Sequence, residues 1–272
     1  MKSARSAILI ALIGVCILSL RRLRQWAGNP PTQRTSHKEA IEPPELVARY
    51  SRFMALLPMR VVRGYLARYA TAGSTQWRIL DVGCGPGWFP LELAECAPQA
   101  AVTGIDLSLP MLTTATAHAA TGNHEQAVHF AQARGEVLPF ADDTFDLVVS
   151  TLALHHVQDP VAALAELRRV AQPSGRILVA DTRRDIHPWL WTLLKASQVG
   201  IDGLALCENG EPSASIGASY TASEAHRLAL QAGWERARVQ VGPGWILLER
   251  LPTQATTYSV PPTPRRKRNS AP

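Results

Sequence analysis

The residue pattern best suited to chemistry is a glycine-rich loop at residues 81–87, Asp-Val-Gly-Cys-Gly-Pro-Gly. Its three glycines, Gly83, Gly85 and Gly87, permit tight backbone angles and let a ligand approach the main chain without a Cβ atom in the way. A β-rich run ends in Asp81, and a helical run follows the loop, so the loop is expected to join a strand to a helix. The pattern predicts a turn that holds a nucleotide-like cofactor, with Asp81 suited to a cationic group.

The spacing of the glycines distinguishes this loop from other nucleotide sites. A dinucleotide site has the pattern G-x-G-x-x-G, with the pyrophosphate at the helix N-terminus, whereas here the third glycine comes one residue earlier. No Gly-Lys-Ser/Thr sequence is present, which excludes a P-loop. Asp106 ends the next β-rich run, about 20 residues past the loop, where a carboxylate can accept hydrogen bonds from two ribose hydroxyls. The two acids together predict a nucleoside cofactor that carries a cation.

Two adjacent histidines, His155 and His156, follow the fourth predicted strand. They lie at the sheet edge where ligands bind in open α/β folds. Histidine titrates near neutral pH, so either residue could serve as general base for an acceptor that must lose a proton. The alternative is a structural role before Asp159-Pro160. The four cysteines show no C-x-x-C spacing and no companion histidine pattern, so no metal site is predicted.

These residues require a sheet whose strands end side by side. From residue 78 the sequence alternates short β-rich runs with amphipathic stretches, which is typical of an α/β fold with a Rossmann-like, doubly wound, mostly parallel sheet. We predict seven strands, with an antiparallel C-terminal hairpin strand, at residues 78–82, 101–105, 128–132, 145–151, 176–180, 235–241 and 245–250. We predict helices at residues 44–57, 60–69, 88–96, 110–119, 160–171, 189–199 and 222–232. The first two helices could cover the site, and Ser108 is a predicted helix cap.

From Ile79 to Asp181 the chain resembles the class I S-adenosylmethionine (SAM)-dependent methyltransferases. The resemblance is to the branch that includes the ubiquinone/menaquinone-biosynthesis C-methyltransferases. The matching segments, in chain order, are residues 81–87, 104–108 (Gly-Ile-Asp-Leu-Ser), 136–140 (Glu-Val-Leu-Pro-Phe), 145–148 (Phe-Asp-Leu-Val), 154–156 with 159–160, and 169–170 with 173–175. The resemblance implies a SAM cofactor and says little about the acceptor.

The resemblance also implies a role for each residue of the loop. Gly83, Cys84, Gly85 and Gly87 would pass under the methionine part of SAM. Asp81 would lie near the ammonium group of that methionine. Methyl transfer from a sulfonium is an in-line displacement, which gains most from positioning and requires no metal.

On the nucleoside side, the resemblance implies that Asp106 holds the ribose hydroxyls and that Leu107 packs on the adenine. The family often has an Asp in a Gly-Asp-Ala-Glu run before Leu138, which accepts a hydrogen bond from the adenine amine. Here the run is Ala-Arg-Gly-Glu, so Arg134 stands in place of that Asp. Glu136 is kept as a candidate cofactor contact, with a structural role as its alternative.

The positive charge of the chain is concentrated at its two ends. The sequence has 28 Lys and Arg and 22 Asp and Glu, a formal net charge of +6. Residues 1–40 and 252–272 hold eleven of the bases and one acid, which leaves 17 bases and 21 acids in residues 41–251. A nucleic-acid enzyme more often carries its bases on the folded body beside the site. We therefore expect no nucleic-acid partner.

Residues 7–20 form an apolar run, AILIALIGVCILSL, with basic residues on both sides. The run is shorter than the about 20 residues of a membrane-spanning helix, and no small-x-small cleavage site follows it. Residues 1–26 are therefore interpreted either as a short uncleaved membrane anchor, or as an interfacial helix or an extension without function. We interpret residues 27–42 as a linker and residues 43–251 as the catalytic domain. Residues 252–272 are predicted to be a disordered basic tail.

The sequence as a whole predicts a SAM-dependent methyltransferase with a small-molecule acceptor. An N-terminal anchor would suit a lipophilic acceptor and would place the enzyme in the cytoplasm, at the cytosolic face of a membrane. Two alternatives stay open. A non-catalytic, membrane-tethered SAM-binding protein is favoured by the departure at Arg134, and an NAD-dependent oxidoreductase shares the fold but does not fit the glycine spacing. The acceptor, the atom that is methylated and the oligomeric state do not follow from the sequence.

Overall fold

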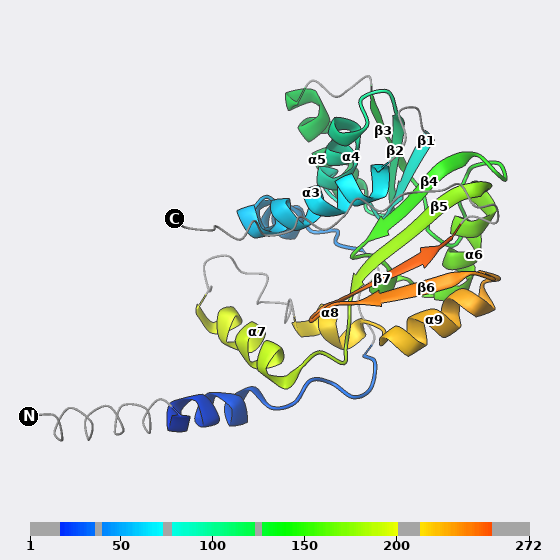
Figure 1. Ribbon diagram of the computed structural model, residues 1–272. Helices are drawn as coiled ribbons and strands as arrows, with labels where there is room; N and C mark the ends of the chain where they lie inside the picture. Colours follow the sequence, from blue (N-terminus) through cyan, green and yellow to red (C-terminus); the bar gives the residue numbers. More distant parts are fainter. Residues whose placement is uncertain (1–16, 36–39, 73–77, 123–126, 201–212, 252–272) are drawn as a thin grey trace, which may run out of the picture.

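The computed structural model describes residues 17–35, 40–72, 78–122, 127–200 and 213–251 (Figure 1). At its centre lies a seven-stranded sheet with the strand order β3-β2-β1-β4-β5-β7-β6. The strands are β1 (Arg78–Val82), β2 (Ala101–Asp106), β3 (Val128–Gln132), β4 (Phe145–Thr151), β5 (Ala171–Thr182), β6 (Ala237–Val241) and β7 (Trp245–Arg250). Strands β1 to β5 pair in parallel, and β7 is antiparallel to both β5 and β6. The predicted mostly parallel sheet with its C-terminal hairpin is confirmed.

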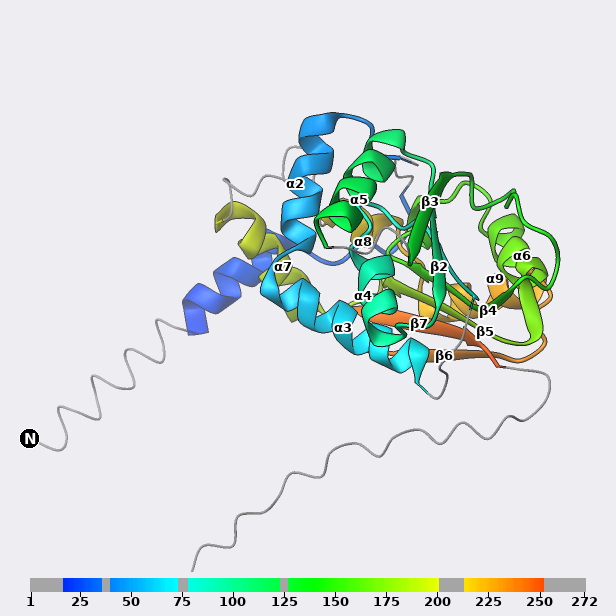
Figure 2. The same ribbon diagram turned by 90° about the horizontal axis from the view of Figure 1, so that it is seen from above.

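Helices cover both faces of the sheet. They are α2 (Pro44–Met54), α3 (Leu57–Thr71), α4 (Trp88–Cys96), α5 (Leu109–Thr121), α6 (Pro160–Val170), α7 (Pro188–Gly200), α8 (Ser213–Ala218) and α9 (Ala222–Gln231), with the 3-10 turn η1 (Leu154–His156) after β4. Helices α3, α4 and α5 lie on one face, and α6 and α9 lie on the other (Figure 2). A helix over residues 17–27, here called the N-terminal helix, precedes them.

The apolar core has two layers because successive side chains of a strand point to opposite faces. Leu80 packs in the layer of α6 and α9, beside Leu164 and the fully buried Trp234. Ile79 packs in the layer of α3 and α4, beside Leu93. Each layer fixes one face of β1, so the end of this strand, where the glycine loop begins, is held rigidly from both sides.

Two short elements and several boundaries differ from the prediction, and the largest boundary difference is at the start of β5. Neither α8 nor η1 was predicted, since a helix of one or two turns leaves no periodicity to detect. Strand β5 begins at Ala171, whereas the prediction began it at Arg176 after a Pro-Ser-Gly turn. The register between β4 and β5 shifts at the predicted turn. Phe145 pairs with Ala171 and Leu147 pairs with Arg176, so β5 has extra residues between Ala171 and Arg176. Ser108 does cap α5, because its hydroxyl accepts a hydrogen bond from the Met111 amide.

The two ends of the chain were interpreted as an apolar segment and a basic tail. Residues 1–16, with most of the apolar run, and residues 252–272 lie outside the described residues. Among the helices that are described, none is both long and apolar enough to cross a membrane. The described parts of residues 27–42 contact the body: Thr35 N donates to Gly217 O at 3.0 Å, and Ser108 Oγ donates to Ile41 O at 2.6 Å.

Candidate cofactor and active site

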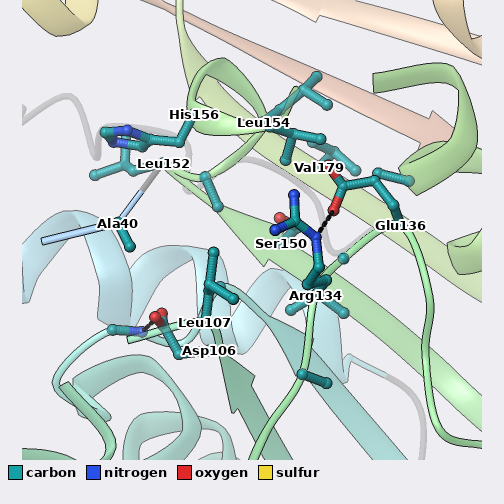
Figure 3. A pocket seen from close by; sticks show the side chains of 18 of the residues that line it. Ala40, Asp106, Leu107, Arg134, Glu136, Ser150, Leu152, Leu154, His156 and Val179 are labelled. Carbon is teal, nitrogen blue, oxygen red and sulfur yellow. Dashed lines mark hydrogen bonds and ion pairs between the residues drawn. The ribbon is translucent and has the colours of Figure 1, made fainter. Parts of the chain in front are cut away.

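A cleft opens at the carboxyl ends of β1 and β4, where the strand order reverses (Figure 3). This is the position at which open α/β sheets bind their ligands. The cleft encloses about 960 Å³ of empty space, open mouth included. The predicted site residues that line it are Gly83, Gly85, Asp106, Leu107, Glu136 and His156.

The glycine loop closes the floor of the cleft in a conformation that needs glycine. Gly83, Gly85 and Gly87 all have positive φ angles, of 77°, 53° and 81°. A Cβ atom on Gly83 would lie 2.5 Å from the Cβ of Ala153, and one on Gly87 would lie 2.7 Å from the Cβ of Ala115. The loop therefore packs directly against η1 and α5 at these two positions.

Two predicted cofactor residues of the loop contribute in a different way. The buried side chain of Cys84 points to the neighbouring strand, since a Cβ on Gly104 would lie 3.0 Å from the Cys84 Sγ. Burial, together with the charges of Asp81 and Asp106, raises the pKa of the Cys84 thiol well above its usual value. Neither Cys84 nor Gly87 is among the described residues that line the cleft. Both residues shape the loop, and their contact with a cofactor stays a prediction.

Asp81 is fully buried at the end of β1. Within the described residues, neither oxygen of its carboxylate has a hydrogen-bond partner. Burial, and then the charge of Asp106, raises the pKa of Asp81 well above its usual value. Asp81 itself does not line the cleft, whereas the next two residues, Val82 and Gly83, do. A buried carboxylate without a partner is costly and rare, so this position calls for a cationic ligand group.

Asp106 lies at the end of β2 and faces the loop. Its Oδ2 accepts a hydrogen bond from Gly85 N at 2.8 Å, and its Oδ1 accepts one from Ser108 N at 2.9 Å. Burial raises the pKa of Asp106, and the hydrogen bonds that its carboxylate accepts from backbone amides partly offset this increase. A carboxylate has about four acceptor positions, so each oxygen can accept one further hydrogen bond. The next residue, Leu107, lines the cleft beside it (Figure 3).

Arg134 and Glu136 lie on the wall beyond Leu107. The Nε atom of Arg134 is 3.8 Å from Oε2 of Glu136, and the two side chains converge over the cleft in Figure 3. Oε1 of Glu136 accepts a weak hydrogen bond from Asp159 N at 3.5 Å. Arg134, which departs from the family pattern, is therefore paired with Glu136, the candidate cofactor contact.

The two predicted histidines have different surroundings. His155 is buried, its Nδ1 lies 2.7 Å from Oδ1 of Asp181, and its amide donates to Oδ2 of the same residue at 3.0 Å. His156 lines the cleft, and its ring centroid is 4.1 Å from that of His155. Between β4 and η1 the backbone passes through Leu152 at a φ of 55°, a strained value for this residue type. The strain accompanies the turn that brings His156 to the cleft.

Three residues from the N-terminal side of the domain contribute to the site or its surroundings. Ile41 and Tyr50 line the cleft. Arg34 donates from Nη2 to His155 O at 3.2 Å and from Nε to Ala218 O at 2.6 Å. Its guanidinium also lies 4.4 Å from the centroid of the Tyr220 ring. Arg34 and Ile41 come from a stretch rich in Pro, Thr and charge, which carries no periodic signal, whereas Tyr50 lies in α2, one of the two helices that were expected to cover the site.

Comparison with known proteins relates this chain to methyltransferases. Residues 80–179 match the family described as a methyltransferase domain. A malonyl-[acyl-carrier protein] O-methyltransferase of Erwinia billingiae is 40% identical over 124 residues, 44% of each chain. A demethylmenaquinone methyltransferase of Roseiflexus castenholzii is 30% identical over 165 residues, 59% of this chain and 66% of its own. The chain thus spans less than two thirds of the length of either relative.

Solved structures share the fold. A protein of Methanococcus maripaludis, described as a candidate S-adenosyl-L-methionine-dependent methyltransferase, superposes with a TM-score of 0.62 at 15% identity. The superposition covers 82% of this chain and 99% of the other. The match of residues 80–179 includes the glycine loop, Asp106, Glu136 and both histidines. Residues 80–179 of the chain match the methyltransferase domain family, in agreement with the resemblance seen in the sequence.

Proposed function

We propose that this protein is an active SAM-dependent methyltransferase with a small, lipophilic acceptor. The observation that carries the proposal is the pair of acids at the ends of neighbouring strands, the fully buried Asp81 and the half-buried Asp106. The carboxylate of Asp81 has no hydrogen-bond partner among the described residues, and Asp106 keeps acceptor capacity on both oxygens. A ligand with a cationic group and a ribose diol suits both acids at once.

We assign parts of the cofactor to residues of the cleft. The methionine ammonium is assigned to Asp81 and to the main chain at Gly83, and the ribose to Asp106. The adenine is assigned to Leu107, with the Arg134–Glu136 pair at its edge. SAM, when bound, supplies an electrophilic methyl group on a sulfonium. The residues of the chain contribute by holding the reacting groups in line and excluding water.

We assign the general base to His156 for an acceptor that must lose a proton. The support is its position in the lining of the cleft; the imidazole would take the acceptor proton as the methyl bond forms. His155 is assigned a positioning role. Its ring is held on Asp181, which orients an imidazole through its second nitrogen, and it packs against His156.

The proposed acceptor is lipophilic for two reasons. The wall of the cleft beside His156 is formed by apolar side chains, Leu152, Leu154 and Val157. The apolar run at residues 7–20 would hold the enzyme at the cytosolic face of a membrane, where such acceptors dissolve. The relatives are named for two different acceptors, a malonyl-acyl-carrier protein and demethylmenaquinone, so the relatives do not specify the acceptor of this chain.

The test is incubation of the full chain with methyl-labelled SAM and an extract of lipids and metabolites from the source cell. The proposal expects label in the organic phase with the wild-type protein and none with Asp106→Ala. Calorimetry with SAM and S-adenosylhomocysteine runs in parallel. Ordinary SAM binding without transfer to any fraction would instead support the non-catalytic binder that the Arg134 departure favours.

A further inference from the structure

Helix α3 exposes an apolar stripe that the cofactor site does not use. Four of its residues are between 59% and 71% exposed: Leu57, Val61, Val62 and Tyr65. Contiguous apolar surface of this kind marks an interaction site more often than scattered exposed residues do. We call these four residues the α3 stripe.

The α3 stripe lies on one side of the helix because its members recur at helical spacing. The opposite side of α3 carries the buried residues Arg63, Ala67 and Ala70. Ala67 and Ala70 pack in the apolar layer shared with α4, and Arg63 forms an ion pair with Glu92 of α4 at 2.9 Å. The helix is therefore fixed to the body by one face and presents the other face outward.

The charges around the α3 stripe differ from those of the rest of the domain. Residues 46–77 contain five arginines and no Asp or Glu, whereas residues 78–251 contain 12 bases and 19 acids. Arg60 and Arg68 of α3 are exposed. The neighbouring helix α4 adds the acids Glu92 and Glu95, of which Glu92 pairs with the buried Arg63. A surface that combines exposed aliphatic and aromatic side chains with an excess of arginines is complementary to anionic lipid headgroups.

Two further elements present the same kind of surface at the same end of the molecule. The N-terminal helix exposes Leu18 and Trp26, and α7 exposes Trp189 and Leu193. Figures 1 and 2 both place these two helices and the N-terminal end of α3 at that end. Trp191 links α7 to the N-terminal helix, since its Nε1 donates to the backbone carbonyl at the end of that helix at 2.9 Å.

We propose that the α3 stripe is a membrane contact that docks on an anionic bilayer surface. A second copy of the chain is a poorer occupant, because pairing of two such stripes would bring arginine against arginine. The inference rests on the membrane location in the proposed function and adds to it. It gives the body its own contact with the bilayer and so orients the catalytic domain there, beyond tethering by residues 7–20.

The test measures binding of the full chain to vesicles, of phosphatidylcholine alone or mixed with phosphatidylglycerol. The variant is Val61→Asp, and the matched control is Leu230→Asp on α9, at a residue that is 49% exposed. We expect Val61→Asp to weaken binding to the anionic vesicles by about tenfold or more, since it removes an apolar contact and adds a repelled charge. The control should bind as the wild type does. Equal binding by Val61→Asp and wild type would overturn the proposal.

Two further measurements keep this test specific. Unfolding temperature and S-adenosylhomocysteine affinity should be the same in Val61→Asp and wild type, because the residue is exposed and remote from the cleft lining. Sedimentation without lipid tests whether the α3 stripe instead binds a second copy of the chain. If the wild type is a dimer and Val61→Asp is a monomer, the stripe is a dimer interface, and this would contradict a membrane contact. Failure of the proposed function would instead appear as absent methyl transfer with vesicle binding unchanged.

Discussion

The cleft has a proposed cofactor half, at the glycine loop and Asp106, and a proposed acceptor half, at η1 with His156, and the two halves are built in different ways. The cofactor half uses adjacent strands: Asp81 pairs with Gly104, and the amides of Gly83 and Cys84 both donate to Ile105 O, at 2.8 and 2.9 Å. The acceptor half joins distant parts of the chain, since Arg34 binds the carbonyl of a residue 121 positions away.

This difference shows how one fold can keep its cofactor while its acceptor changes. Strand register and a short glycine pattern fix the positions of the cofactor groups, so they vary little without loss of the fold. The groups around η1 depend on long-range contacts of loops, which tolerate substitution. Substitutions in the first half should therefore abolish binding, and those in the second should alter turnover.

The largest effect is expected for Asp106→Ala. Two charge-assisted hydrogen bonds of about 1.5 kcal/mol each would be lost with the ribose, so affinity for S-adenosylhomocysteine should fall by about 100-fold or more. Gly85 N and Ser108 N also lose their acceptor, so the unfolding temperature should decrease. Calorimetry and thermal melts measure the two effects, with the exposed Glu235→Ala as matched control. Ordinary affinity in Asp106→Ala would contradict the ribose assignment.

A smaller effect, on turnover alone, is expected for His156→Gln. Loss of a general base costs on the order of 100-fold in rate, while SAM affinity should stay within about twofold because the cofactor contacts are on the other half. Single-turnover rates with the acceptor from the extract experiment measure this, and His129→Gln, at an exposed residue of β3, is the control. An equal loss in affinity and rate would place His156 in the cofactor half. An unchanged rate would mean that the acceptor needs no base from this residue.

The next effect depends on pH and concerns Asp81→Asn. Because burial raises the pKa of Asp81, the ligand-free protein holds a proton there at pH values where a free Asp is ionised, and SAM must displace it. Wild-type affinity should therefore rise with pH, by at most about tenfold per pH unit below that pKa. The Asp81→Asn variant should lack this rise and bind about tenfold more weakly at the alkaline end. Calorimetry in buffers of different ionisation enthalpy measures the proton release.

The stability of the ligand-free protein gives an independent check on Asp81. A carboxyl group whose pKa is raised on folding stabilises the protein below its unfolded pKa, and that contribution is lost as the pH rises through the folded pKa. Asp81→Asn should remove this loss, so the variant should melt at a higher temperature than wild type on the alkaline side. A lower melting temperature there would mean that the carboxylate has a stabilising partner.

The sequence predicted the cofactor half because its signals are local. Periodicity gave the strands, glycine spacing gave the loop, and Asp106 followed at the end of the next strand. It could not separate His155 from His156, since their difference in burial arises from Asp181, 26 residues along the chain. It also could not predict the contacts of Arg34, because a stretch without periodicity does not show where it folds back. Contacts between residues far apart in the chain position the side chains of the acceptor half, and a single sequence does not show which distant residues meet.

The smallest expected effect is that of Arg34→Ala, which tests the acceptor half through its most distant contact. Two hydrogen bonds to backbone carbonyls and the contact with Tyr220 are lost, but Arg34 is largely exposed, so water replaces much of the interaction. A net loss of about 1 kcal/mol should reduce turnover by about fivefold with unchanged SAM affinity, and should speed amide exchange at residues 154–157. Arg34→Lys keeps the charge without the planar guanidinium, so its turnover should lie between those of wild type and Arg34→Ala. If Arg34→Ala instead lowered SAM affinity and left turnover alone, the residue would act on the cofactor half, and the division of the cleft would be wrong at this point.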